Sequence, residues 1–94
     1  MPILNKRGPL EESLEDAKRA RAQIRDGIRT MNLAEPVKAL KIRQRDLGMR
    51  IGNAYHYAKK TLYWYEVGDL RRAERNADLW IAHIERFIEK TRGR

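Results

Sequence analysis

With 94 residues, a formal net charge of +8 and no cysteine, the chain is expected to form one domain, residues 1–94, with a modest core and no deep active-site cleft. The absence of cysteine excludes disulfides and thiolate metal sites. No apolar run approaches the roughly 20 residues that span a bilayer, and the first ten residues lack the apolar centre of a signal peptide, so we expect a cytoplasmic protein with no membrane partner.

The first predicted helix covers about residues 10–31, after a proline at position 9. Its acidic residues come early and its basic residues late, which complements the helix dipole and needs no ligand as an explanation. The apolar residues that recur at helical spacing, and are expected to face the core, are Leu10, Leu14, Ala17, Ile24, Ile28 and Met31.

The second predicted helix is the longest and covers about residues 36–67. Pro36 suits a first helical position, because its missing N–H costs nothing there. Gly68 marks the end of the helix, and Gln44 is the only interruption of its apolar face. That face consists of Val37, Leu40, Leu47, Ile51, Ala54, Ala58, Leu62 and Tyr65.

A second, weaker stripe on the same predicted helix indicates a contact beyond the core. Gly48 and Gly52 border this stripe, and each costs about 1 kcal/mol of helix propensity relative to alanine. Two alternatives follow: the helix bends here, or another helix approaches closely, inside the bundle or between subunits. The length of this helix favours a homo-oligomer. The predicted interface residues are Ile42, Gly48, Met49, Gly52, His56 and Tyr63.

The third predicted helix covers about residues 69–91, with Asp69 as its capping residue. Its buried face consists of Leu70, Ala73, Ala77, Trp80, Ile84 and Phe87, widened by Ile81 and Ile88. A face this wide packs against two other helices. The predicted fold is therefore all-α, a three-helix antiparallel bundle with a long central helix, and no segment shows the alternation of a strand.

Two clusters of basic residues are expected where antiparallel helices meet. Near the first connection, Arg25 and Arg29 should approach Lys38, Lys41 and Arg45. Near the second, Arg71, Arg72 and Arg75 should approach Lys59 and Lys60, beside Trp64 and Tyr63. Basic residues mixed with aromatics suit phosphate contact and base stacking. The alternative is that these residues form a solvated rim, with Tyr65 and Trp80 in the core. The predicted nucleic-acid-binding residues are Arg25, Arg29, Lys38, Lys41, Arg45, Lys59, Lys60, Trp64, Arg71, Arg72 and Arg75.

Arg50 and His56, with five residues between them, are similar to the signature of helical ribonucleases called HEPN domains. That resemblance implies RNA cleavage by an arginine and a histidine across a dimer interface. Ile51 stands where the family has a polar residue, and Ala58 where it has a tyrosine. On one continuous helix, residues six apart also lie about 120° apart in azimuth. We therefore do not expect the two side chains to converge.

The rest of the chain offers no catalytic constellation. Ser13 is the single serine, and there is no glycine-rich phosphate loop. Neither His56 nor His83 has a further ligand at a convincing metal-binding spacing, so both are expected to pack rather than to coordinate. The sequence predicts a protein that is not an enzyme, with no catalytic residues, no metal site and no cofactor.

A broader resemblance covers residues 58–80, about a quarter of the chain. It rests on Leu62, Gly68–Asp69–Leu70, Arg72–Ala73, Ala77 and Trp80. This pattern is similar to the helical hairpin of a small archaeal family of unknown function. The resemblance implies a helical bundle and transfers no activity and no functional residues.

The composition and clusters together predict a non-enzymatic basic helical module for binding or assembly, in a nucleic-acid or nucleoprotein context. The alternative is an adaptor or inhibitor whose basic face binds an acidic protein surface. A ribonuclease that uses Arg50 and His56 is a remote third hypothesis. The first two differ in salt dependence, because phosphate binding weakens steeply and uniformly as salt rises.

Overall fold

The computed structural model describes residues 8–28 and 32–92 of the chain. Within these ranges it contains four α-helices and no strand: α1 (Pro9–Arg25), α2 (Ala34–Leu47), α3 (Ala54–Val67) and α4 (Leu70–Arg92). The all-α class is therefore confirmed for this part of the chain. The prediction of three helices is wrong, because the expected central helix over residues 36–67 is two separate helices.

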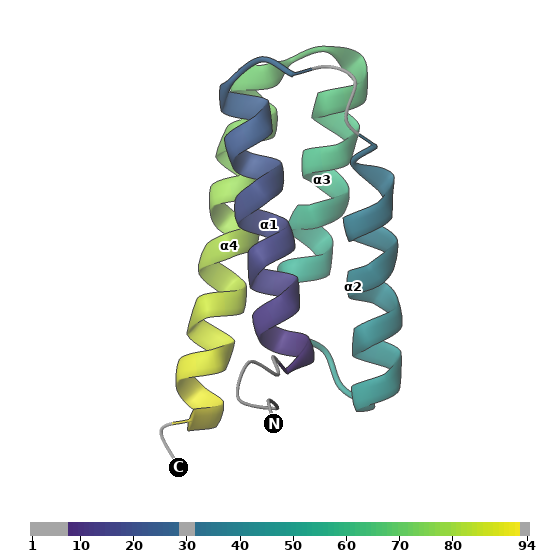
Figure 1. The fold of residues 1–94 in the computed structure, drawn as a ribbon, viewed down its shortest axis with the longest axis vertical. Helices are drawn as coiled ribbons and strands as arrows, with labels where there is room; N and C mark the ends of the chain where they lie inside the picture. The colour runs from purple at the N-terminus through teal and green to yellow at the C-terminus, as the bar shows by residue number, and fades with distance from the viewer. Residues whose placement is uncertain (1–7, 29–31, 93–94) are drawn as a thin grey trace, which may run out of the picture.

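Successive helices run antiparallel, so the chain passes up and down the bundle (Figure 1). The most extensive packing is between α3 and α4, followed by that between α1 and α4. α2 packs less extensively against α1 and α3. The bundle measures 40 × 29 × 21 Å along its principal axes. α4 is therefore the helix on which the bundle packs, and α2 is the most peripheral helix.

The break between α2 and α3 begins at Gly48, whose φ of 69° is left-handed and ends the helix. The N–H of Met49 donates to the Gln44 carbonyl (3.1 Å), which is the bond of a Schellman motif. The side-chain oxygen of Gln44 accepts a hydrogen bond from the N–H of Ile51 at 2.9 Å. Gly52 (φ 55°) turns the chain again before α3. Gln44 interrupts the apolar face because it stabilises this turn.

Gly48 and Gly52 were expected to mark either a bend in the helix or a close approach of another helix. The chain does more than bend, since the α-helix ends before Gly48 and a new one begins at Ala54. A Cβ added at Gly48 would meet no described atom within 4 Å, so this glycine does not serve a close helix contact. A Cβ at Gly52 would lie 3.5 Å from Nδ1 of His83, which is ordinary contact with α4.

α1 also ends earlier than expected, at Arg25 rather than near position 31. Gly27 has φ 75°, and the N–H of Ile28 donates to the Gln23 carbonyl at 2.9 Å, so the same Schellman stop operates. Arg29 and Met31 lie outside the described residues. α3 also ends at a glycine with a left-handed φ, Gly68 (φ 91°), which is the helix end that the sequence predicted.

The core lies where α4 meets α1 and α3. Trp80 and Ile84 are almost completely buried, and so are Ala58 and Ile51, as their spacing predicted. Tyr65 is also buried, and its hydroxyl donates to the Ile28 carbonyl at 2.8 Å, which ties α3 to the end of α1. The described residues that form the buried apolar core are Ala17, Ala20, Ile24, Leu33, Val37, Leu40, Ile51, Ala54, Ala58, Tyr65, Ala73, Ala77, Trp80, Ile81 and Ile84.

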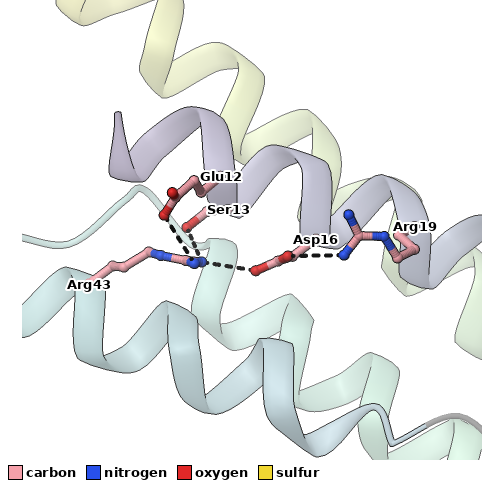
Figure 2. Close-up of polar contacts among 5 residues, drawn as sticks. All are labelled: Glu12, Ser13, Asp16, Arg19 and Arg43. Carbon is pink, nitrogen blue, oxygen red and sulfur yellow. Dashed lines mark hydrogen bonds and ion pairs between the residues drawn. The ribbon is translucent and has the colours of Figure 1, made fainter. Parts of the chain in front are cut away.

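α2 is held to α1 by a polar network as well as by apolar contacts (Figure 2). The Arg43 guanidinium donates to Ser13 Oγ at 3.1 Å and to Asp16 Oδ2 at 2.9 Å, and it lies 3.4 Å from a carboxylate oxygen of Glu12. Asp16 also lies 3.5 Å from Arg19. Ser13 is 2% exposed, so its hydroxyl depends on Arg43 for this contact. The network fixes the register of α2 along α1.

Candidate functional site

The ring of Tyr55, on the first turn of α3, has lysines from two different helices over it. The Nζ atom of Lys59 is 4.7 Å from the centre of the Tyr55 ring, and that of Lys41, on α2, is 6.0 Å away. A cation over an aromatic face is favourable by about 0.5–1 kcal/mol at an exposed site. One lysine comes from each of the two predicted basic clusters, so the fold joins parts of the clusters that the sequence had kept separate.

Two adjacent depressions surround the turn between α2 and α3. One has a volume of about 450 Å³ and is lined by Gln44, Arg50, Gly52, Asn53, Tyr55, His56, Tyr57 and Lys59. The other, of about 530 Å³, is lined by Arg50, Gly52, Asn53, His83, Arg86, Phe87 and Lys90. The two depressions share Arg50, Gly52 and Asn53, and we call the residues that line them together the Arg50 surface.

The Arg50 surface is positively charged. Its full charges belong to Arg50, Lys59, Arg86 and Lys90, and among the described residues no carboxylate lines either depression. Arg86 and Lys90 are four positions apart on α4, with His83 one turn earlier, so all three lie on the same side of that helix. The break after α2 places Arg50 beside them. The surface thus depends on a turn and a helix that are distant in sequence.

Three aromatic rings lie in a row at this surface, two from α3 and one from α4. Tyr57 meets His56 edge to face at 5.0 Å between ring centroids, and it stacks on His83 at 5.1 Å. Burial lowers the pKa of His83 below its ordinary 6.5, and the positive charge of Arg86 lowers it further. The neutral form of His83 is therefore favoured, and an anion bound beside it would favour its protonation.

Several acidic residues lie at other helix boundaries. Glu74 and Asp78 of α4 pair with α1, through Arg25 at 2.8 Å and Arg21 at 3.1 Å. The carboxylates of α1 that face α2 surround Arg43. These pairs compensate charge between helices. The Arg50 surface has no such compensation among its lining residues, so it is expected to carry a positive potential.

The first predicted basic cluster is only partly assembled. Arg25 reaches Glu74 on α4 rather than a residue of α2, and Arg29 lies outside the described residues. Lys38 is exposed on α2. Arg45 is also exposed, with a long contact of 3.7 Å to Asp46. Of this group, Lys41 comes nearest to the Arg50 surface: it lies over the Tyr55 ring, but it does not line either depression.

The second predicted cluster forms a separate cation–aromatic contact. The Arg72 guanidinium lies 4.6 Å from the centre of the half-buried Trp64 ring, and it is also 3.5 Å from Asp69. Tyr63 is 57% exposed and meets Trp64 edge to face. The remaining members of the cluster, which are exposed at the surface of the hairpin, are Lys60, Arg71 and Arg75.

The predicted interface stripe does not exist as a single helical face, because α2 ends at Leu47, before Met49, and α3 begins only at Ala54. Its members are still exposed: Ile42 by 47%, Met49 by 52% and Tyr63 by 57%. His56 is exposed too, and it lines the Arg50 surface.

Sequence reasoning missed the contribution of α4 to the site. Arg86 and Lys90 were not selected, because they lie far from both helix connections. The available signals were the spacing of His83, Arg86 and Lys90 on one face and the two glycines that flank Arg50. Neither signal predicts the site unless it is known that the helix ends before Arg50.

Within the described ranges, no group of three potential ligands is arranged to hold a metal ion, and no described helix is long and apolar enough to cross a membrane. Comparison with known proteins adds no relative: no family model matches the chain, and no curated protein or solved structure shows significant similarity to it. The functional argument therefore rests on the geometry of the Arg50 surface.

Proposed function

We propose that this protein is a non-enzymatic binding module whose Arg50 surface contacts the phosphate backbone of a nucleic acid. The observation that carries the proposal is the absence of any carboxylate among the described residues that line the two depressions, which contain Arg50, Lys59, Arg86 and Lys90. Clustered cations release counterions from a phosphate backbone when they bind it, and this release drives association.

The aromatic residues support a nucleic acid over a simple anion. Tyr55 is half-buried and lines the surface between two lysines. An aromatic ring beside phosphate-binding cations lets a base stack while its backbone is neutralised. Tyr57 and the two histidines add further rings along the same surface.

Fluorescence anisotropy with a labelled single-stranded RNA and a labelled duplex DNA tests the proposal. The double variant Arg50→Ala/Arg86→Ala is expected to weaken binding at least tenfold at about 0.1 M salt. The slope of log K against log salt is expected to become shallower by about 1.4–1.8, since each lost phosphate contact removes about 0.7–0.9.

Arg19→Ala is the matched control, because Arg19 is an exposed arginine that lines a different groove, between α1 and α2. It is expected to change affinity less than twofold. If two arginine-to-alanine substitutions on α1 lowered the affinity as much as the double variant does, the result would contradict a defined binding site. No binding to either nucleic acid at low salt would reject the proposal and leave an acidic protein surface as the partner to test.

A second candidate function has one observation in its favour. Arg50 and His56 line the same depression, because Arg50 lies in the turn rather than on the helix that carries His56. The azimuthal separation expected on a continuous helix therefore does not apply. Incubation with a labelled RNA separates this candidate from the first: cleavage that is lost in His56→Ala, with RNA binding retained, would favour a ribonuclease.

A further inference from the structure

The turn between α2 and α3 interrupts an apolar pattern that continues through it in helical phase. Val37 and Leu40 are buried before the turn, Ile51 within it, and Ala54 and Ala58 after it. These positions are three, eleven, three and four residues apart, and eleven residues are close to three helical turns, so all five would lie on one face of a continuous helix. The segment from Ala34 to Val67 can therefore bury the same residues as two helices joined by a turn or as one continuous helix.

Two glycines favour the turn over the continuous helix. Gly48 and Gly52 have φ values of 69° and 55°, in the left-handed region that other residues avoid. Glycine also weakens a helix interior, by about fivefold per residue relative to alanine. The glycines thus favour the turn twice, by permitting its backbone and by disfavouring the continuous helix.

The first connection of the chain cannot straighten in the same way. It ends α1 with the same kind of glycine, Gly27 at φ 75°. A helix continued from α1 into α2, however, would carry Pro36 in its interior, where the proline ring clashes with the preceding turn. Residues 37–94 contain no proline. No proline therefore prevents the turn at Gly48 from becoming helical.

We propose that two copies of this chain exchange their α1–α2 units by straightening the turn at residues 48–53. In the exchanged dimer, α1 and α2 of each copy pack on α3 and α4 of the other. The ion pairs Arg21–Asp78 and Arg25–Glu74, and the apolar contacts between α1 and α4, re-form between copies. Because exchange preserves these contacts, the free-energy difference between the two states is concentrated in the turn.

Gly48→Ala tests the exchange. Alanine at φ 69° strains the closed turn and favours the helix, which together shift each chain about thirtyfold towards the straight form. A dimer contains two such segments, so its association constant is expected to increase about a thousandfold. Size-exclusion chromatography with light scattering should show a change from 11.1 kDa towards twice that mass.

Gly27→Ala is the matched control. Gly27 and Gly48 both have a left-handed φ, and a Cβ added at either meets no described atom within 4 Å. The two substitutions therefore strain the monomer alike, whereas Pro36 prevents a helix from continuing past Gly27. Gly27→Ala is expected to remain monomeric.

Cross-linking distinguishes exchange from a side-by-side dimer. The chain has no cysteine, so Arg25→Cys and Glu74→Cys, at the ends of one α1–α4 ion pair, introduce the only two thiols. A short bismaleimide is expected to join two chains of an exchanged Gly48→Ala dimer, visible on a denaturing gel. In a side-by-side dimer the same reagent would join thiols of one chain.

Two results would overturn the proposal: a folded Gly48→Ala protein that stays monomeric, or a dimer whose cross-links remain within single chains. If Gly48→Ala does not fold, Gly52→Ala provides the same test. Its Cβ would meet His83 only at an ordinary contact distance of 3.5 Å, and it too is expected to dimerise.

Discussion

The α3–α4 hairpin and α2 are held in the bundle by different interactions. The hairpin buries the large apolar side chains of Trp80 and Ile84 in one core with small residues such as Ala58. α2 buries Val37 and Leu40 of its own residues and adds the charged network of Arg43. Apolar burial stabilises over a broad area, whereas a partly buried charge network fixes one arrangement and depends on every partner. We therefore expect α2 to be the first helix to separate from the bundle.

The largest effect is expected in the hairpin. Trp80→Ala removes the largest fully buried side chain and should lower the free energy of unfolding by about 3–5 kcal/mol. Urea denaturation followed by circular dichroism measures this loss, and Trp64 remains as a fluorescent reporter. A loss below about 1 kcal/mol would show that the hairpin is not the main source of stability.

The next effect concerns α2. Arg43→Ala leaves Ser13 and Asp16 without their α2 partner. The free energy of unfolding should fall by about 1–3 kcal/mol, because these side chains are largely buried but Asp16 keeps some contact with water. Hydrogen exchange should rise in α2 more than in α3 and α4. The neighbouring Arg45→Ala is the control, because its side chain is 76% exposed, and it should change stability by less than about 0.5 kcal/mol. Uniform loss of protection in all helices would show that α2 is not a separate unit.

A smaller effect is expected at the exposed cation–aromatic pair of the hairpin. Arg72→Ala removes the guanidinium over Trp64 and should cost about 0.5–1 kcal/mol, with a change in tryptophan fluorescence. Arg75→Ala, exposed on the same helix, should leave the fluorescence unchanged. If both variants behave alike, the pair contributes nothing specific.

The smallest effect is a pH dependence carried by His83. Its pKa in the folded protein lies below the ordinary value of 6.5, so the unfolded chain binds more protons in the window just below pH 6.5. The free energy of unfolding should therefore fall as the pH drops through that window, and be insensitive to this group above it. His83→Gln should remove this contribution, and His56→Gln should retain it. Equal pH profiles for the wild type and His83→Gln would contradict this assignment.

The difference between the two regions also explains what the sequence could predict. The hairpin was predicted well, because Gly68 and Asp69 stand at a boundary where the apolar face changes phase. The break at Gly48 was not, since Ile51 continues the helical phase through the turn. Two glycines cost a helix only about 2 kcal/mol in total, so propensity alone does not decide between a long helix and a turn. The Schellman bond and the Gln44 side chain decide it.

The Arg50 surface was not predicted for the same reason. Its basic residues from α3 and α4 are visible in the sequence, but their meeting with Arg50 requires the turn. The selection of Lys41 and Lys59 came from antiparallel pairing, and the structure places both beside Tyr55. Whether any of these residues binds a nucleic acid remains a prediction to be measured.

A titration of ¹⁵N-labelled protein with a short single-stranded RNA, followed by NMR at about 0.1 M salt, tests the central claim most directly. The account predicts that amide shifts concentrate at residues 50–59 and 83–90, that α1 is unaffected, and that the shifts vanish by about 0.5 M salt. Shifts centred on α1, or none at low salt, would contradict the assignment of the Arg50 surface as the binding site.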